Sequence, residues 1–154
     1  MELEKLAAQY YAAEEGGGAL YAAAERLRAT LPETVRAALE RTGDFHDYGL
    51  AELSLRGEAL ILRLRCFGRC APKPYRVRLR FDGVEYLRLH GDFSAAGGDG
   101  LIQGRRGHPP AQVLALWMGV ENGAYEALVL LDNGRWFCLR ARNARCIWEK
   151  EANA

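Results

Sequence analysis

The spacing of apolar residues changes once along this chain, and that change limits the fold more than any other feature. Before Gly43, apolar residues such as Leu3, Leu6 and Tyr10 recur every three or four positions, as on a helix with one buried face. After Gly43 they recur every second position, as on strands with one buried face. Helices followed by strands predict a protein of the α+β class.

Two to three helices are predicted before the change of period, at residues 2–14, 19–30 and 33–41. Thr30 and Glu33 have the spacing of a capping box, in which the two side chains satisfy backbone N–H groups at a helix start. Gly43 follows the third helix, where a left-handed glycine commonly ends a helix. The helical part is therefore expected to cover about residues 2–42 of a single domain, 1–154.

About seven strands are predicted in the sheet part, about residues 50–148. They are expected at 51–56, 60–67, 75–81, 84–90, 112–120, 124–131 and 135–141, with a short eighth strand at 144–148. Asp82-Gly83, Asn122-Gly123 and Asn133-Gly134 are typical of hairpin turns. Successive hairpins form an antiparallel β-meander, and the helices are expected to cover one of its faces.

The third predicted strand has the clearest alternation in the chain. Its apolar residues are Tyr75, Val77, Leu79 and Phe81, and the residues between them are Arg76, Arg78 and Arg80. The apolar residues are expected beneath the helices and the arginines on the outer surface. A hairpin with the preceding strand would place Arg63 and Arg65 beside them. We call this surface the arginine face.

The arginine face has three interpretations, because like charges across neighbouring strands repel unless something offsets them. The first is a solvated face neutralised by carboxylates of the chain, the second a face that binds an acidic protein surface, and the third a face that binds nucleic acid. Residues 56–154 carry 16 basic and 10 acidic side chains, so charge alone does not decide. Sheets that bind single strands stack bases on aromatic rows, whereas these rows offer only Phe67 and Ile61 besides arginine and other polar residues. Nucleic acid is therefore the less favoured partner.

Compartment and cofactor are predicted from what the sequence lacks. No stretch approaches the roughly 20 apolar residues that span a bilayer, and the charged N-terminus is unlike a secretory signal, so a cytoplasmic protein with no membrane partner is expected. The cysteines do not have the tight spacing of a zinc site. They are expected to be free thiols, with no metal or cofactor: Cys66, Cys70, Cys138 and Cys146.

His46-Asp47 lies between the last predicted helix and the first strand. A carboxylate beside an imidazole is a common acid–base pair, but adjacent residues in an extended segment point to opposite faces. The favoured interpretation is structural, with Asp47 bonding backbone N–H groups and His46 packing or capping the helix. No frame such as Gly-x-Ser-x-Gly is present, so no catalytic residue is predicted and the protein is not expected to be an enzyme.

Residues 91–110 contain six glycines and end in Pro109-Pro110. A loop of this length is either mobile or functional. It lacks the Gly-Lys-Ser/Thr of a specific phosphate loop, and Leu101-Ile102 is too little apolar surface to fold the loop into a packed element alone. We expect a mobile loop that contacts a partner, if it has a function, through Arg105 and Arg106.

The order of helix, Leu31-Pro32, helix, His46-Asp47 and strands resembles a group of small bacterial proteins with a His-Asp pair before a β-meander. The closing segment 130–137 and residues 144–148 are also similar to their last hairpin, but the loop 91–110 is not matched. Some relatives look like immunity proteins of bacterial toxin systems. The resemblance implies a fold and no established activity. The prediction is a non-catalytic protein that binds an acidic partner and resembles an immunity protein, with nucleic-acid binding through the arginine face as the alternative.

Overall fold

The computed structural model describes residues 2–12, 18–66, 76–91, 93, 100–103 and 111–149. The helices are α1 (Glu2–Ala12), α2 (Gly18–Ala29) and α3 (Glu33–Thr42). The strands are β1 (Tyr48–Arg56), β2 (Ala59–Cys66), β3 (Arg76–His90), β4 (Gly100–Gln103), β5 (Ala111–Glu121), β6 (Ala124–Leu131) and β7 (Trp136–Glu149), with a 3-10 turn η1 (Asp132–Gly134) before β7. The predicted α+β class with antiparallel strands is confirmed.

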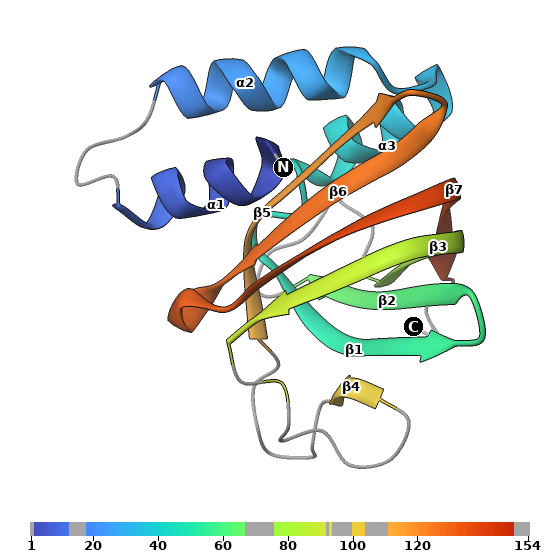
Figure 1. The fold of residues 1–154 in the computed structure, drawn as a ribbon. Coiled ribbons are helices and arrows are strands. Elements are labelled where there is room, and N and C mark those ends of the chain that lie inside the picture. The colour runs from blue at the N-terminus through green and yellow to red at the C-terminus, as the bar shows by residue number, and fades with distance from the viewer. Residues whose placement is uncertain are drawn as a thin grey trace.

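Six strands form a closed antiparallel ring. Their order is β1-β2-β3-β7-β6-β5, and β5 pairs again with β1 through Gly49↔Gln112 and Leu50↔Ala111. The short strand β4 continues along the same edge of β1, where Leu53 pairs with Ile102. The ring thus consists of two three-stranded meanders, β1-β2-β3 and β5-β6-β7, joined at two seams (Figure 1).

The prediction of one continuous meander is wrong at β3. β3 replaces two predicted strands, 75–81 and 84–90. β7 likewise replaces the two predicted at 135–141 and 144–148. Both are continuous because β3 and β7 pair along their whole length. Asp82-Gly83 is therefore not a hairpin. Gly83 has a φ of +63° within β3, which bends the strand while both halves keep the same neighbour. By contrast, Asn122-Gly123 forms the predicted tight turn between β5 and β6, with φ values of 51° and 75°.

The interior of the ring is the main hydrophobic core. Each of the six strands contributes buried side chains, among them Leu53, Leu62, Leu79, Met118, Val129 and Leu139. Val35 and Leu39 of α3 belong to the same cluster, so α3 covers the core where it would otherwise meet water. Val77, Leu79 and Phe81 are buried as predicted, but inside the ring rather than beneath the helices, because the opposite wall of the sheet covers them. Tyr75 lies outside the described residues.

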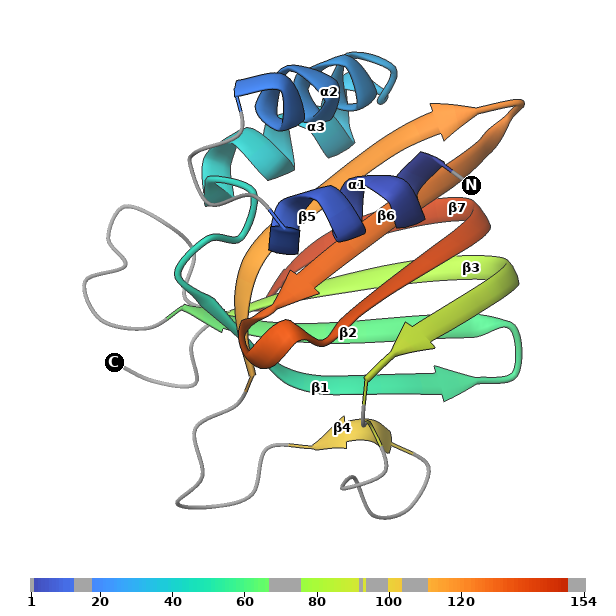
Figure 2. The same ribbon diagram turned by 60° about the vertical axis from the view of Figure 1, so that its left-hand side comes forward.

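A second apolar layer lies outside the ring, between helices α1 and α2 and the outer surface of β5, β6 and β7 (Figure 2). Leu6 and Leu20 on the helices pack with Trp117, Leu128 and Leu130 on the strands. The strands of this meander are therefore buried on both faces. Among the described residues, α1 and α2 pack on β5, β6 and β7, and they do not pack on the outer surface of β1 and β2.

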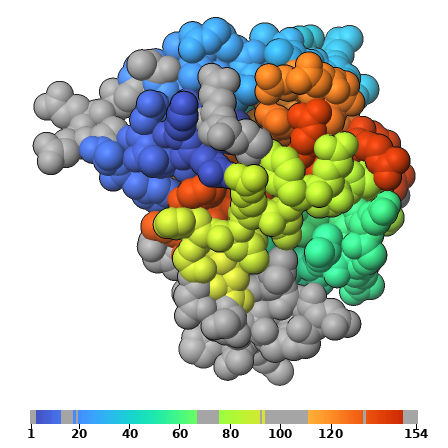
Figure 3. Space-filling view, in the orientation of Figure 1, coloured from blue at the N-terminus to red at the C-terminus, as the bar shows by residue number. Residues whose placement is uncertain are grey.

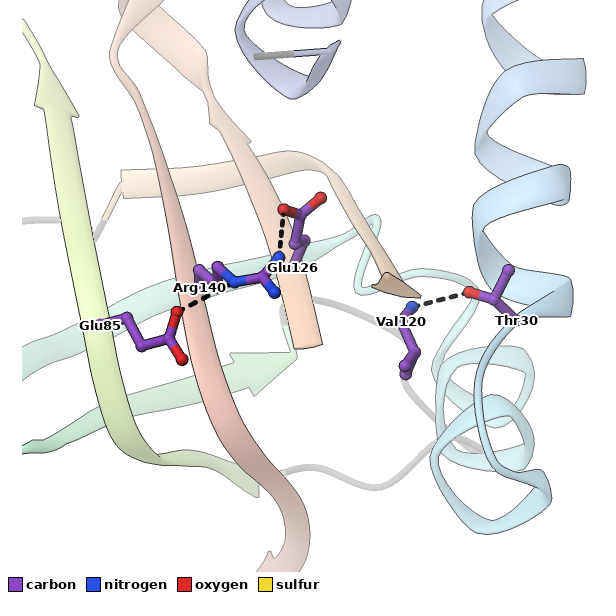
Figure 4. A network of polar contacts seen from close by, with 5 residues as sticks. All are labelled: Thr30, Glu85, Val120, Glu126 and Arg140. Carbon is purple, nitrogen blue, oxygen red and sulfur yellow. Dashed lines mark hydrogen bonds and ion pairs between the residues drawn. The ribbon is translucent and has the colours of Figure 1, made fainter. Parts of the chain in front are cut away.

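Thr30 at the end of α2 does not form the predicted capping box. Pro32 precedes α3 without a side-chain cap, whereas the Thr30 hydroxyl donates to the Leu27 carbonyl at 2.5 Å and accepts from the Val120 N–H at 2.7 Å (Figure 4). Thr30 thus ties α2 to β5. The approach is close enough that Gly119, the residue before Val120, has Leu27 directly against its α-carbon.

Candidate anion-binding site on the arginine face

The arginine face forms in the predicted register. Across β2 and β3, Arg63 pairs with Arg78 and Arg65 with Arg76, while Arg80 lies opposite Ile61. The face extends in both directions beyond the prediction, because Arg80 also pairs with Arg145 on β7 and Arg63 with Glu52 on β1. Figure 1 shows these four strands side by side. The result is a basic surface across β1, β2, β3 and β7.

Carboxylates within the face hold two of the arginines in place. Glu52 contacts the Nε of Arg63 at 3.0 Å, and Asp82 contacts the Nε of Arg80 at 2.9 Å. Asp82 also approaches Arg145 at 3.8 Å. Both of the close ion pairs use Nε, so neither consumes the Nη donors of its guanidinium group. These ion pairs reduce the repulsion expected between arginines on neighbouring strands. They also orient the guanidinium groups of Arg63 and Arg80 without using their Nη donors.

A cavity of about 280 Å³ lies in the middle of this face. Outward-facing side chains of three strands line it: Glu52, Ser54, Arg56, Ala59, Ile61, Arg63, Arg78 and Arg80. Four of these eight residues are arginine and one is acidic, a formal net charge of +3. Such a lining favours an anion.

Ser54 on β1 differs from the other lining residues because its hydroxyl is buried without a hydrogen bond to any described residue. It is only 3% exposed, and its Oγ has no hydrogen-bond partner among the residues that the structure describes. Burying a hydroxyl without a partner costs about 1–3 kcal/mol. Sequence reasoning missed Ser54, although it lies on the same outward row of β1 as Glu52 and Arg56.

His46 and Asp47 touch, contrary to the expectation that they diverge. His46 Nδ1 lies 3.2 Å from Asp47 Oδ1, and the two side chains are 62% and 58% exposed. The contact arises because Asp47 has a φ of +72°, so the segment turns where an extended segment was predicted. His46 is therefore not packed in the core. An exposed pair of this kind interacts weakly in water, and it lies apart from the cavity lining.

The turn before His46 is left-handed over three consecutive residues. Gly43, the predicted C-cap, has a φ of +61°, and Asp44 and Phe45 have 57° and 59°. Non-glycine residues in this conformation cost roughly 1–2 kcal/mol each. Phe45 offsets the cost by complete burial against Tyr48, and Asp44 by an ion pair with Arg28. The segment is a structural connection between α3 and β1.

The loop 91–110 is described only in part. Arg105 and Arg106 lie outside the described residues. Two parts of the segment pack against the rest of the chain: Gly100–Gln103 forms β4 against β1, and Phe93 is buried beside Phe137. Both depend on contacts outside the segment, in agreement with the expectation that it forms no packed element alone. Pairing with β1 supplies the backbone hydrogen bonds that the local sequence alone did not indicate.

Cys66 is disulfide-bonded to a residue outside the described ranges, so the prediction of free thiols is wrong for Cys66. Cys138 and Cys146 are free, as predicted. Disulfides are rare in the cytosol, and the cytoplasmic location therefore stays a prediction.

Thiol reactivity provides a test of the burial of Cys146. Burial raises the pKa of its thiol from 9.0 to about 12, and that of Cys138 to about 11. Since only the thiolate reacts, Cys146 in the folded protein should react with an aromatic disulfide reagent on the order of a thousandfold more slowly than in denaturant. Stopped-flow absorbance measures both rates. Equal rates in the two states would show that Cys146 is accessible.

A second polar cluster lies on the outer surface of β3, β7 and β6, away from the cavity. Arg140 donates at 3.0 Å to both Glu85 and the buried Glu126 (Figure 4). Nearby, Arg88 of β3 forms an ion pair with Glu4 of α1. Figure 3 shows β3 and α1 in contact on one face of the molecule. These contacts join the two meanders to each other and to α1.

Glu126 should make stability depend on pH. Burial raises the pKa of its carboxyl above 4.5, although the hydrogen bond from Arg140 opposes the shift. The folded state then holds this proton more strongly than the unfolded state, so stability falls as the pH rises through the raised pKa. In Glu126→Gln this contribution is absent. Urea unfolding from about pH 4 to 7 should show wild type losing stability relative to the variant. A relative gain with rising pH would contradict the assignment.

Within the described ranges, no three His, Cys, Asp or Glu side chains come together as metal ligands would. None of the helices there is long and apolar enough to cross a membrane.

The sequence matches no protein-family model and no curated protein. Among solved structures, the chain is similar to one described as an uncharacterized protein from Neisseria gonorrhoeae, with 15% identity and a TM-score of 0.46 over 66% of this chain and 91% of that chain. Function therefore has to be argued from the residues of this chain, and the resemblance to proteins with a His-Asp pair stays a prediction.

Proposed function

We propose that this is a non-catalytic protein, similar to an immunity protein, whose arginine face docks on an acidic protein surface. The observation that carries the proposal is the orientation of two arginines of this face, Arg63 and Arg80, whose Nε atoms contact carboxylates of the same face. A guanidinium group fixed in this way keeps Nη donors for a second carboxylate and loses little side-chain freedom when it binds one.

An acidic protein fits this face better than nucleic acid. Among the described residues, the outward positions of β1, β2 and β3 around the cavity hold no aromatic side chain on which a base would stack. Glu52 and Asp82 lie among the arginines and would repel a continuous phosphate backbone. Separate carboxylates of a protein partner can approach between them.

Charge reversal on the face tests the proposal. The full chain carrying Arg63→Glu and Arg80→Glu should bind immobilised polyglutamate at least about tenfold more weakly than wild type at low salt. Arg26→Glu with Arg36→Glu, on α2 and α3, makes the same change of net charge elsewhere and should retain most of the binding. Surface plasmon resonance measures both affinities, and circular dichroism checks that each variant is folded.

Two outcomes would overturn the proposal. Equal weakening by the helix variant would show that net charge, and not this face, drives binding. Tighter binding of a single-stranded oligonucleotide than of polyglutamate at the same salt, with affinity falling steeply between about 50 and 200 mM salt, would favour the nucleic-acid alternative.

A further inference from the structure

We infer that the cavity on the arginine face receives one glutamate side chain of the protein partner, in which Arg63 and Arg80 bind the carboxylate and apolar residues of the lining contact the methylene groups. The inference deepens the proposed function and rests on it, because it assigns one partner side chain to the centre of the same face. Two observations carry it. The cavity has an apolar as well as a basic lining, and two of its arginines are oriented by carboxylates of the face.

Arg63 and Arg80 are placed to bind one carboxylate together. On β2, Arg63 pairs with Arg78 of β3, and Arg80 lies two residues further along β3. Diagonal neighbours of this kind are separated by roughly 7–8 Å, within reach of long side chains. Both side chains line the cavity and are 47% and 37% exposed, so a partner can reach them from solvent. Since their close ion pairs use Nε, the Nη donors can bind a further carboxylate.

The apolar part of the lining comes from β2. Ala59 and Ile61 lie in the cavity among the arginines, and the short side chain of Ala59 leaves space between longer neighbours. Ala59 pairs with the exposed Arg56 of β1. The aliphatic stems of arginine side chains extend an apolar surface of this kind. A side chain with methylene groups and a terminal carboxylate therefore matches the lining, whereas a bare anion leaves its apolar part unfilled.

The length of the partner side chain favours glutamate over aspartate. Long arginine side chains line the cavity, so the partner backbone stays outside them and its carboxylate has to reach inward. Glutamate has one more methylene group than aspartate, and burial of one methylene group favours binding about fourfold. The cavity of about 280 Å³ equals on the order of nine water molecules. This is room for one such side chain and too little for a folded element of the partner.

The experiment measures binding of the full chain to immobilised polyglutamate and polyaspartate, which carry the same charge per residue, by surface plasmon resonance. Wild type should bind polyglutamate about fourfold more tightly or better. Ala59→Leu fills the cavity without changing the net charge. It should weaken polyglutamate binding by about tenfold and remove the preference over polyaspartate. Ala8→Leu makes the same change at an exposed position of α1 and should bind both polymers as wild type does.

A second variant tests the apolar contact without filling the cavity. Ile61→Ala removes most of an apolar side chain from the lining and leaves every arginine in place. Its affinity for polyglutamate should fall toward that for polyaspartate, while binding to polyaspartate is retained. Circular dichroism checks that each variant is folded.

The results separate the inference from the function beneath it. Equal affinity of wild type for the two polymers, or unchanged polyglutamate binding by a folded Ala59→Leu variant, would overturn the inference. Weaker binding after charge reversal of Arg63 and Arg80 would then leave the proposed function standing. Failure of wild type to bind either polymer would overturn both. If Ala59→Leu does not fold, Ile61→Ala decides, and an unchanged preference for polyglutamate in that variant overturns the inference.

Discussion

Replacing Phe81 by alanine should lower the free energy of unfolding by about 3–5 kcal/mol. Phe81 is completely buried inside the ring of strands, in the same cluster as residues from all six of them. Removing the phenyl group of Phe81 leaves a cavity. The closed sheet cannot collapse to fill this cavity, because each strand is held by hydrogen bonds to a neighbour on both sides. For a domain whose total stability is about 5–15 kcal/mol, this is a large share. Urea unfolding followed by tryptophan fluorescence measures it.

The neighbouring residue provides the control. Arg80→Ala changes a side chain that is 37% exposed on the outer surface, with an ion pair to Asp82. Its expected cost is below about 1 kcal/mol, as for other exposed ion pairs. A larger loss for Arg80→Ala than for Phe81→Ala would mean that the alternation along β3 has been assigned to the wrong faces.

Replacing Gly119 by alanine should lower the free energy of unfolding by about 1–3 kcal/mol. A Cβ atom at this position would lie 2.9 Å from the Leu27 carbonyl oxygen and 3.0 Å from Thr30 Oγ1. These atoms belong to the end of α2, so the helix has to move away from β5. Such a movement also weakens the hydrogen bond from the Val120 N–H to Thr30.

Gly18→Ala is the matched control for Gly119→Ala, because an added Cβ there meets nothing within 4 Å and Gly18 lies at the start of α2. Alanine favours a helix over glycine, so this variant should be unchanged or slightly more stable. Thermal unfolding by circular dichroism compares the two. Equal stability of both variants would show that α2 does not pack against β5 at this distance.

Local patterns predicted the elements, and contacts between distant residues decided how they assemble. The alternation of apolar and polar residues through Val77 and Leu79 predicts a strand. This pattern is local, because it compares residues only two positions apart. Whether that strand pairs with the next strand or with β7 depends on a segment about 60 residues away, which no local pattern encodes. Asp82-Gly83 illustrates the ambiguity, since a glycine with positive φ serves a hairpin turn and a bend within a strand equally well.

Thr30 shows the same limit at a helix end. Its spacing from Glu33 is that of a capping box, but Thr30 does not cap α3. Its hydroxyl instead accepts a hydrogen bond from the Val120 N–H of β5. The arginines of the candidate site were predictable from alternation alone. Ser54 was not, because its burial depends on the folded surroundings of β1, where Ser54 pairs with Ile61 of β2 and Gly100 of β4. A serine at an outward position of a strand is ordinary until its surroundings are known.

The seam between β1 and β5 has a consequence for how the chain folds. Each three-stranded meander consists of contacts between neighbouring segments. Among the described residues, β1 and β5 close the ring through two residue pairs, Gly49 with Gln112 and Leu50 with Ala111, which are about 60 residues apart in sequence. Closing a loop of that length costs entropy before the contact repays it. We therefore expect closure to follow hairpin formation and to limit the folding rate. The same seam is the place where the native sheet should open first, exposing backbone amides of both strands to hydrogen exchange while β3 and β7 remain protected.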